Sequence, residues 1–266
     1  MIRLIGLPTD VNSSFLRGPA KAPSAIRRVL FSDMGNPAAE CGLELGGDIP
    51  FEDVGDLPLR ERPEDDGLIE QAVAEALAAG DAPVLLGGDH SVTYPVLRAV
   101  AARYGPVQVL QIDAHPDLYD SYQGNRRSHA SPFARIMEDG LASRLVQVGI
   151  RTLSAHCREQ AARFGVEIIP MAGFTQAAEP TMDGPLYISI DLDGLDPAFA
   201  PGVSHHEPGG LTVRQLVDLL SRIKARVVGA DIVEYNPDRD LNDMTAAVAA
   251  KLVKELASLI WRARKR

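Results

Sequence analysis

Short apolar runs alternate with helical patterns along almost the whole chain, and this alternation restricts the fold more than any other feature. Segments 83–87, 186–191 and 227–233 carry mostly apolar residues at consecutive positions, a pattern typical of strands that are covered on both faces. Strands and helices that follow one another in this way form a mainly parallel sheet with helices on both sides. We therefore expect an α/β fold in three layers, α/β/α.

The same patterns locate the individual elements. The segment 66–79 is predicted to be helical, because apolar residues recur there at helical spacing and Gly80 follows as a stop signal. Strands are predicted at 2–7, 51–56, 83–87, 107–113, 145–150, 166–170, 186–191 and 227–233, and helices at 23–31, 66–79, 91–104, 132–138, 154–164, 212–223 and 244–262.

Composition limits the class of protein. The chain has 266 residues, 45% of them hydrophobic, and no linker-like segment, so we expect a single domain over residues 1–266. The formal charge of -9 and the scattered Lys and Arg residues argue against nucleic acid as a partner. No apolar run is long enough to span a membrane and no signal-peptide pattern is present. We therefore expect a soluble, cytoplasmic protein without a membrane partner.

Ligand-type side chains follow the strand predicted at 107–113. Asp113, His115 and Asp117 stand at alternate positions, and alternate residues of an extended chain point the same way. Burying two carboxylates and an imidazole without partners would cost several kcal/mol. A bound cation would remove this cost, so the cluster is a candidate metal site. The alternative is a solvated turn after a strand.

Two further predicted strands end in side chains of the same kind. His90 comes after Gly87, Gly88 and Asp89 at the end of the segment 83–87, and Asp191 and Asp193 stand at the end of the segment 186–191. In open α/β sheets the site lies at the carboxyl ends of the strands, so the three clusters are expected to meet. Imidazoles and carboxylates without a thiolate suit Mn(II) or a similar hard cation. If two ions share the carboxylates, a bridging water has room, and hydroxide becomes available near neutral pH.

The motifs that carry these residues resemble a known family. In chain order, three of them are similar to the three signatures of the ureohydrolases, the family of arginase, agmatinase and formiminoglutamase. Further segments resemble the plant-type arginase branch, and the resemblance covers essentially the whole chain. The signature-like segments are GGDHS at 87–91, DAHPD at 113–117 and SIDLDGLDP at 189–197, and the branch-like segments are NSSFL at 12–16, SHAS at 128–131, APGVSH at 200–205 and MTAAVAAKLV at 244–253.

The resemblance implies a fold, a cofactor and an assembly. Family members have an α/β/α domain with an eight-stranded parallel sheet, hold two Mn(II) per subunit and form trimers or hexamers, so a homo-oligomer is expected. Asp113 and Asp191 would bridge the two ions. By the resemblance, the ligands of one ion would be His90, Asp113, Asp117 and Asp191, and those of the other would be Asp113, His115, Asp191 and Asp193.

The charge of the site and the resemblance agree on a small, cationic guanidino substrate. Four carboxylates, two divalent cations, a hydroxide and Glu234 at the end of the strand 227–233 sum to about -2, which attracts a cation. In the family, the matching Glu holds the guanidinium. The resemblance makes His129 the carrier of a proton to the leaving amine, while Asp117 would accept or position another proton. The products would be urea and a primary amine.

The sequence leaves open which guanidino compound is hydrolysed. Arginine, which would give ornithine and urea, is the first choice, and agmatine or another guanidino compound is the alternative. A formimino hydrolase is less favoured, because Glu234 favours a cation. A binding protein without activity is least favoured, because no ligand position is lost.

The loop after Asp117 holds candidates for recognition of the rest of the substrate. Asn125 and Ser128 are predicted to contact an amino-acid head group, and Arg126 or Arg127 to face a carboxylate. The alternative for all four is a solvated loop. His205 is expected near the mouth of the pocket and outside the ligand set.

Overall fold

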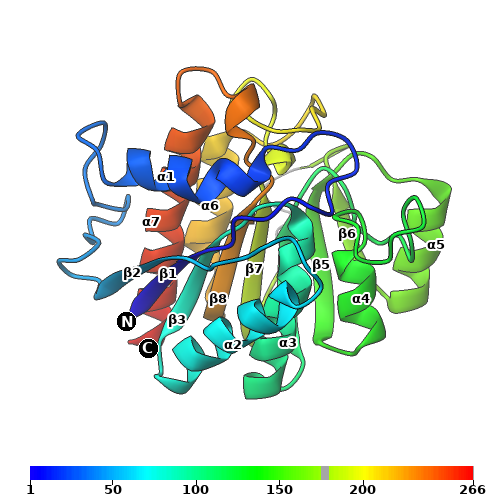
Figure 1. Cartoon of the computed structure of the whole chain (residues 1–266), viewed down its shortest axis with the longest axis horizontal. Coiled ribbons are helices and arrows are strands. Elements are labelled where there is room, and N and C mark those ends of the chain that lie inside the picture. Colours follow the sequence, from blue (N-terminus) through cyan, green and yellow to red (C-terminus); the bar gives the residue numbers. More distant parts are fainter. Residues whose placement is uncertain (175–179, 266) are drawn as a thin grey trace.

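One parallel sheet forms the centre of the protein, for which a computed structural model describes residues 1–174 and 180–265. In this part of the chain, eight strands pair in the order β2-β1-β3-β8-β7-β4-β5-β6 (Figure 1). Every pair of neighbouring strands is parallel, so the predicted α/β fold with an eight-stranded sheet is confirmed. The strands are β1 Ile2–Gly6, β2 Phe51–Asp56, β3 Ala82–Leu86, β4 Val107–Ile112, β5 Ala142–Ile150, β6 Glu167–Pro170, β7 Pro185–Asp191 and β8 Arg226–Val233.

Helices cover both faces of this sheet and complete the three layers (Figure 1). The helices α1 and α6 pack beside α7 on one face, and α3 packs beside α2 and α4 on the other, where α5 joins the same core. The first layer consists of α1 Ala22–Leu30, α6 Val213–Arg222 and α7 Met244–Arg264, and the second of α2 Asp65–Ala78, α3 Thr93–Tyr104, α4 Pro132–Glu138 and α5 Ala155–Phe164.

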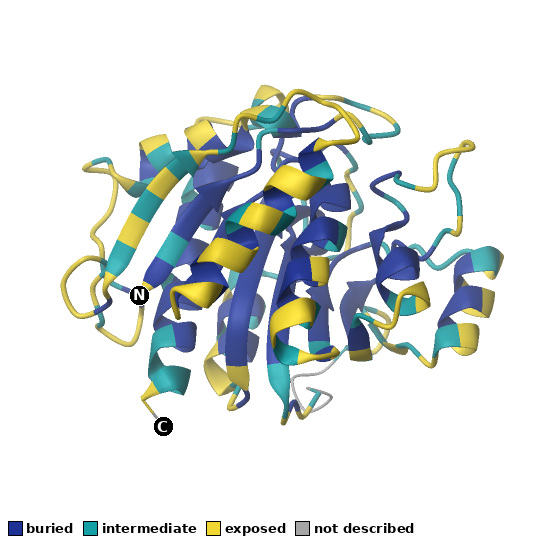
Figure 2. Cartoon of the chain, turned by 60° about the horizontal axis from the view of Figure 1, so that its bottom comes forward, coloured by how far each residue is buried: buried dark blue, intermediate teal, exposed yellow. Residues whose placement is uncertain are grey.

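The consecutive apolar residues of the central strands pack into two hydrophobic cores, one on each face of the sheet. In β4, Leu110 and Ile112 pack in the core under α7, whereas Val107 and Val109 pack in the core under α3. Figure 2 shows the central strands buried along their length, while the edge strand β2 alternates between half-buried and exposed residues. Burial on both faces explains why the runs are continuous rather than alternating.

Element ends differ from the predictions by a few residues, for local reasons. The helix predicted from residue 91 begins with the 3-10 turn His90–Val92, because the Asp89 side chain accepts the N–H of Ser91 and caps this turn. The strand β5 begins at Ala142, earlier than predicted, because this residue still pairs with Val107 of β4. Across the described residues, the helices lack the length and apolar character needed to cross a membrane.

The strand order determines where the polar segments meet. The strands β3, β8, β7 and β4 are consecutive neighbours in the middle of the sheet, so the four segments that follow them lie side by side at one edge. The loop after β1 also reaches this edge, because Gly88 has no side chain and lets the backbone of Thr9 pack directly against its own. A Cβ atom on Gly88 would stand only 1.6 Å from the carbonyl oxygen of Thr9.

Candidate metal centre

His90 is fully buried and faces three carboxylates. Its Nδ1 atom lies 3.2 Å from Asp113 Oδ2, 3.1 Å from Asp117 Oδ2 and 3.3 Å from Asp191 Oδ2. This nitrogen has no hydrogen-bond partner among the described residues. Side chains from the ends of three strands therefore aim a nitrogen and carboxylate oxygens at one point, which is a donor set for a divalent cation.

A buried chain of hydrogen bonds sets the tautomer of His90. The Ser189 hydroxyl donates to Asp231 Oδ1 at 2.6 Å, so its oxygen accepts the Nε2–H of His90 at 2.9 Å. Asp231 is fully buried and also accepts from the hydroxyls of Thr93 and Tyr187. In the neutral His90 ring, the proton on Nε2 leaves a lone pair on Nδ1, as a metal ligand must have.

A second group of ligand-type atoms adjoins the first. His115 Nδ1 lies 3.0 Å from Asp193 Oδ2 and 3.6 Å from Asp113 Oδ1, so Asp113 belongs to both groups. Gly194 permits this approach, because a Cβ atom there would stand 2.9 Å from the backbone nitrogen of Asp113. The structure thus brings together all six predicted ligand side chains: His90, Asp113, His115, Asp117, Asp191 and Asp193.

The carboxylates of these groups repel one another. Burial and the charges of Asp193 and Asp113 raise the pKa of Asp191 well above its usual range. Burial and the charge of Asp113 likewise raise the pKa of Asp117 to about 6. A divalent cation would relieve both the burial cost and the repulsion. Together with the lone pair on His90, this crowding shows that the side chains fit metal ions.

The hydrogen bond from His90 to Ser189 gives a first testable prediction. Ser189→Ala should weaken metal binding by roughly 10- to 100-fold, the usual effect of losing a group that orients a ligating His, although all six ligand-type side chains remain. Competition with a chelator of known affinity measures this change. Ser258→Ala is the matched control, because it removes a buried hydroxyl of α7 that donates to Glu255. Equal metal affinity of Ser189→Ala and wild type would contradict the proposed role.

Glu234 lies beside the cluster with one carboxylate oxygen free. Oε1 accepts the backbone N–H of His90 at 2.8 Å and pairs with Nδ1 of His129 at 2.8 Å, whereas the buried Oε2 has no partner among the described residues. Burial raises the pKa of Glu234, but the charge and hydrogen bond of His129 and the N–H of His90 together lower it. Burial lowers the pKa of His129, but Glu234 raises it to about 9. A charged carboxylate with a free oxygen can accept cationic N–H donors.

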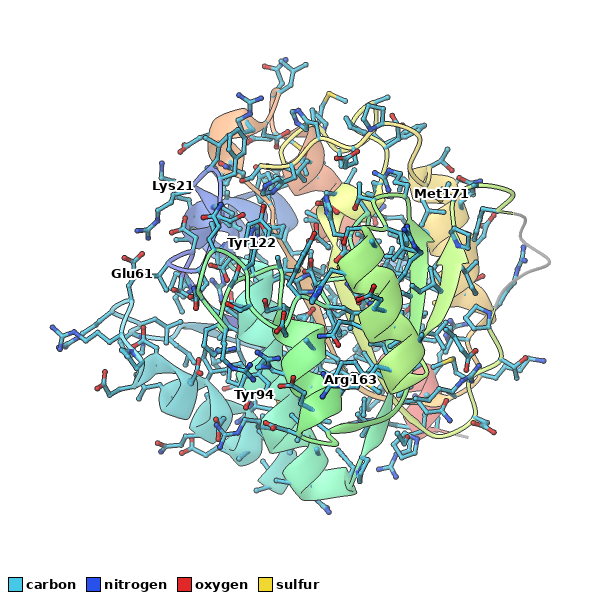
Figure 3. The ribbon with its side chains drawn as sticks, turned by 90° about the vertical axis from the view of Figure 1, so that its right-hand side faces the viewer. Lys21, Glu61, Tyr94, Tyr122, Arg163 and Met171 are labelled. Carbon is cyan, nitrogen blue, oxygen red and sulfur yellow. The ribbon has the colours of Figure 1, made fainter. Side chains whose placement is uncertain are left out.

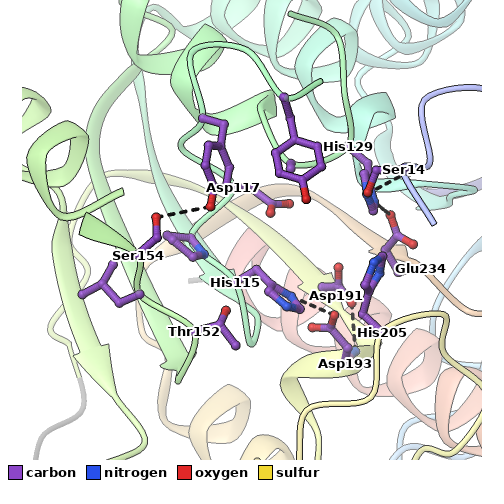
Figure 4. Close-up of a pocket in the computed structure, with 15 residues that line it drawn as sticks. Ser14, His115, Asp117, His129, Thr152, Ser154, Asp191, Asp193, His205 and Glu234 are labelled. Carbon is purple, nitrogen blue, oxygen red and sulfur yellow. Dashed lines mark hydrogen bonds and ion pairs between the residues drawn. The ribbon is translucent and has the colours of Figure 1, made fainter. Parts of the chain in front are cut away.

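A cavity of 470 Å³ opens over these residues (Figure 4). His90 and Asp113 lie beneath it, while the other ligand-type side chains, Glu234 and His129 form its inner end. Its wall also includes aromatic and hydroxyl side chains from the loops after β4 and β5, among them Tyr122 (Figure 3). The lining residues are Ser14, His115, Pro116, Asp117, Tyr119, Tyr122, His129, Ala130, Thr152, Leu153, Ser154, Asp191, Asp193, His205 and Glu234.

Asn125 and Ser128 do not line this cavity. Asn125 is exposed and donates to Asn12 Oδ1 at 3.0 Å, and the Ser128 hydroxyl accepts the N–H of Ala130. Their predicted contact with a head group therefore receives no support from the geometry.

The two arginines of the same loop also point elsewhere. Arg126 pairs with Glu138 at 2.9 Å, and Arg127 pairs with Asp66 at 2.7 Å. Neither arginine lines the cavity, so neither stands ready to face a substrate carboxylate.

Sequence reasoning missed several residues of the cavity wall. Tyr119 donates to Ser154 at 3.2 Å, and Thr152 lies beside them. Their signal in the sequence was their position directly after β4 and β5, where an α/β sheet carries its site. Ser14 had a weaker signal, because it comes from the loop after β1. His205 lies on the wall, with its ring 5.3 Å from that of His129.

The fold and the site define a class of α/β proteins that carry a carboxylate-rich metal site at the ends of parallel strands. Comparison with known families narrows the class. The model of the arginase family matches residues 1–258, and the chain belongs to this family.

The most similar known proteins include arginases of plants. "Arginase 1, mitochondrial" of Arabidopsis thaliana is 50% identical over 97% of this chain and 80% of its own length. The solved arginase of Medicago truncatula superposes with a TM-score of 0.93 at 43% identity, over 97% of this chain and 87% of that one. "Agmatinase, mitochondrial" of Gallus gallus is 35% identical over 96% of this chain and 80% of its own length.

These comparisons correct one prediction. A cytoplasmic location was expected, but the Arabidopsis and chicken relatives are both mitochondrial enzymes by name, so that expectation is wrong. Its basis was weak, because the compartment is set by targeting segments, and the composition of a catalytic domain carries no such information.

Proposed function

We propose that this chain is an amidinohydrolase that cleaves L-arginine to ornithine and urea. The observation that carries the proposal is the position of Glu234, which lines the same cavity as the His and Asp cluster and whose buried Oε2 has no partner among the described residues. A guanidinium is a planar fork of N–H donors that fits such a carboxylate. The 50% identity to a plant arginase supports the same activity.

Two Mn(II) ions are proposed as the cofactor. His90, Asp113, Asp117 and Asp191 would hold one ion, and Asp113, His115, Asp191 and Asp193 the other. The support is the donor set, which is rich in carboxylate oxygen, includes imidazole and lacks thiolate. When bound, two such ions lower the pKa of a shared water and supply hydroxide near neutral pH.

The side chains of the cavity would divide the remaining work. Glu234 would hold the guanidinium through Oε2, while Oε1 accepts the N–H of His90 and, until proton transfer, the Nδ1–H of His129. Asp117 would accept or position a proton of the attacking water. His129, whose Nδ1 lies beside Glu234, would give a proton to the amine nitrogen as the C–N bond breaks and the bond electrons pass to that nitrogen.

Agmatine is the second candidate substrate, and one observation favours it. Among the described residues that line the cavity, none is Lys or Arg, so no ammonium or guanidinium group of the wall can pair with an α-carboxylate. Agmatine has no such carboxylate, and the chicken relative is an agmatinase.

A panel of substrates tests the proposal. Urea release should be measured with arginine, agmatine, guanidinobutyrate, guanidine and formiminoglutamate on protein loaded with Mn(II). Faster release from arginine than from agmatine supports the first candidate, and the reverse order supports the second. If formiminoglutamate alone were consumed, releasing formamide, the assignment of a guanidinium site would be wrong.

Two broader expectations belong to this proposal. Residues 1–266 are proposed to act as one catalytic domain, and the support is that all described strands join one sheet. A homo-oligomer, trimer or hexamer, stays a prediction from the family resemblance. Size measurement in solution by light scattering checks it.

A further inference from the structure

The loop between β1 and α1 is fastened to the loop that carries His129. Asn12 makes this link, because its carbonyl accepts the N–H of His129 at 3.1 Å and its side-chain oxygen accepts from Asn125 at 3.0 Å. Its side-chain amide donates to Ser91 Oγ at 3.0 Å. These contacts fix the two loops relative to each other and place Ser14 beside the His129 ring (Figure 4).

Ser14 touches the ring nitrogen that faces away from Glu234. Its backbone N–H donates to His129 Nε2 at 3.2 Å, and its hydroxyl oxygen lies 2.8 Å from the same nitrogen. A backbone N–H can only donate, so in the neutral ring Nε2 is the acceptor and the ring proton sits on Nδ1, toward Glu234 Oε1. Ser14 and Glu234 thus hold the imidazole from its two sides.

The protonated ring of His129 needs a hydrogen-bond acceptor from Ser14 rather than a donor. An imidazolium carries a proton on both nitrogens, so its Nε2–H needs an acceptor. Among the described residues, the Ser14 hydroxyl is the acceptor within reach of Nε2, and a hydroxyl can change from donor to acceptor by rotating. Without this hydroxyl, the Nε2–H of the imidazolium would face the backbone N–H of residue 14.

We propose that Ser14 is a positioning residue for proton transfer, whose hydroxyl supports His129 in its neutral and protonated forms alike. This inference rests on the proposed function for its kinetic consequence. The imidazolium gives its Nδ1 proton to the departing amine nitrogen, the electrons of the C–N bond stay on that nitrogen, and the ring becomes neutral with its proton on Nε2. The Ser14 oxygen holds that proton until Nδ1 is protonated again.

Ser14→Ala should lower kcat for the best guanidino substrate by roughly 10- to 100-fold, the effect of one hydrogen bond to a charged group, with little change in KM. Ser14→Thr keeps the hydroxyl and should retain most of the activity. Ser13→Ala is the matched control, because the Ser13 hydroxyl has no partner among the described residues. Equal kcat values for Ser14→Ala and wild type would overturn the proposal.

A double variant separates action through His129 from general damage. If Ser14 acts through His129, adding Ser14→Ala to His129→Ala should cause no further loss of kcat, because the shared partner is already absent. Independent, multiplicative losses in the double variant would show that Ser14 acts on something else and would overturn the proposal.

A second readout does not depend on activity. The charges of Glu234, Asp117 and Asp89 favour the imidazolium of His129, whereas burial of the ring, the largest single effect, opposes it. The ring of His205 packs beside that of His129. In protein loaded with diamagnetic Mg(II), the His129 ring signals should titrate at lower pH in Ser14→Ala than in wild type. An unchanged titration overturns the proposal even if the wild type releases no urea. Absence of urea with a shifted titration would reject the proposed function alone.

Discussion

Asp191→Asn is expected to abolish most urea release and to lower the metal content of the purified protein. Asp191 lies 3.3 Å from His90 Nδ1 and is proposed to bridge both ions, so an amide there removes a charge from each. We expect activity to fall by roughly a thousandfold, as when a group that stabilises developing charge is lost. Metal analysis by mass spectrometry and urea assays on the same samples measure both effects.

Thermal unfolding provides an independent check on this variant. The metal-free protein should not be destabilised by Asp191→Asn, because the change removes one of several crowded carboxylates, while an amide oxygen can still accept the N–H of Asp193. A chelator should lower Tm strongly in wild type and weakly in Asp191→Asn, since a metal stabilises only the state that binds it. Asp196→Asn, in a nearby turn, is the control. Full metal content and activity in Asp191→Asn would refute the metal assignment.

Glu234→Gln should keep both metal ions and lose most of its activity on guanidino substrates. The amide retains the shape of the side chain and can still accept the N–H of His90, but it loses the charge that a guanidinium requires. We expect kcat/KM to fall by roughly a hundredfold, the upper range for a hydrogen bond to a charged group. Steady-state urea release and metal analysis measure the two properties separately.

Glu255→Gln is the control for Glu234→Gln. Glu255 is a buried acid on α7 that accepts from Lys251 and from the backbone of Glu40, well outside the cavity lining. Its replacement should leave kcat/KM near that of wild type. If Glu234→Gln also shows wild-type kinetics on every substrate of the panel, another group must hold the guanidinium.

The fold was predictable because its signals are local. The strands buried on both faces, such as β7, carry mostly apolar residues at consecutive positions, and α5 starts after the capping residue Ser154 and stops at Gly165. The strand order was not predictable from these signals, because the pairing of β3 with β8 joins residues far apart in the chain. That pairing is decided by packing of the whole sheet, on which local patterns carry no information.

The site was predictable to the extent that its residues belong to strand ends. The six ligand-type side chains directly follow or end apolar runs, and they meet in the structure. Asn125 was predicted to contact the substrate head group only because it lies in the loop after Asp117. In the structure its side chain donates to Asn12 instead. Ser14 and Asp231 act through contacts with residues far away in sequence. Such contacts depend on the finished packing, so neither residue carried a signal of its role.

The cavity is built from two parts with separate origins, and this separation bears on how such enzymes diverge. Asp191, Asp193 and Glu234 lie at or directly after the ends of central strands, where a substitution disturbs the core. Tyr119, Tyr122 and Thr152 instead belong to surface loops, which tolerate change. A lineage can therefore exchange one head group for another by altering these loops and inherit the reactive centre intact. The same three positions are where a randomised library should begin if this scaffold is to be redirected toward a new guanidino compound.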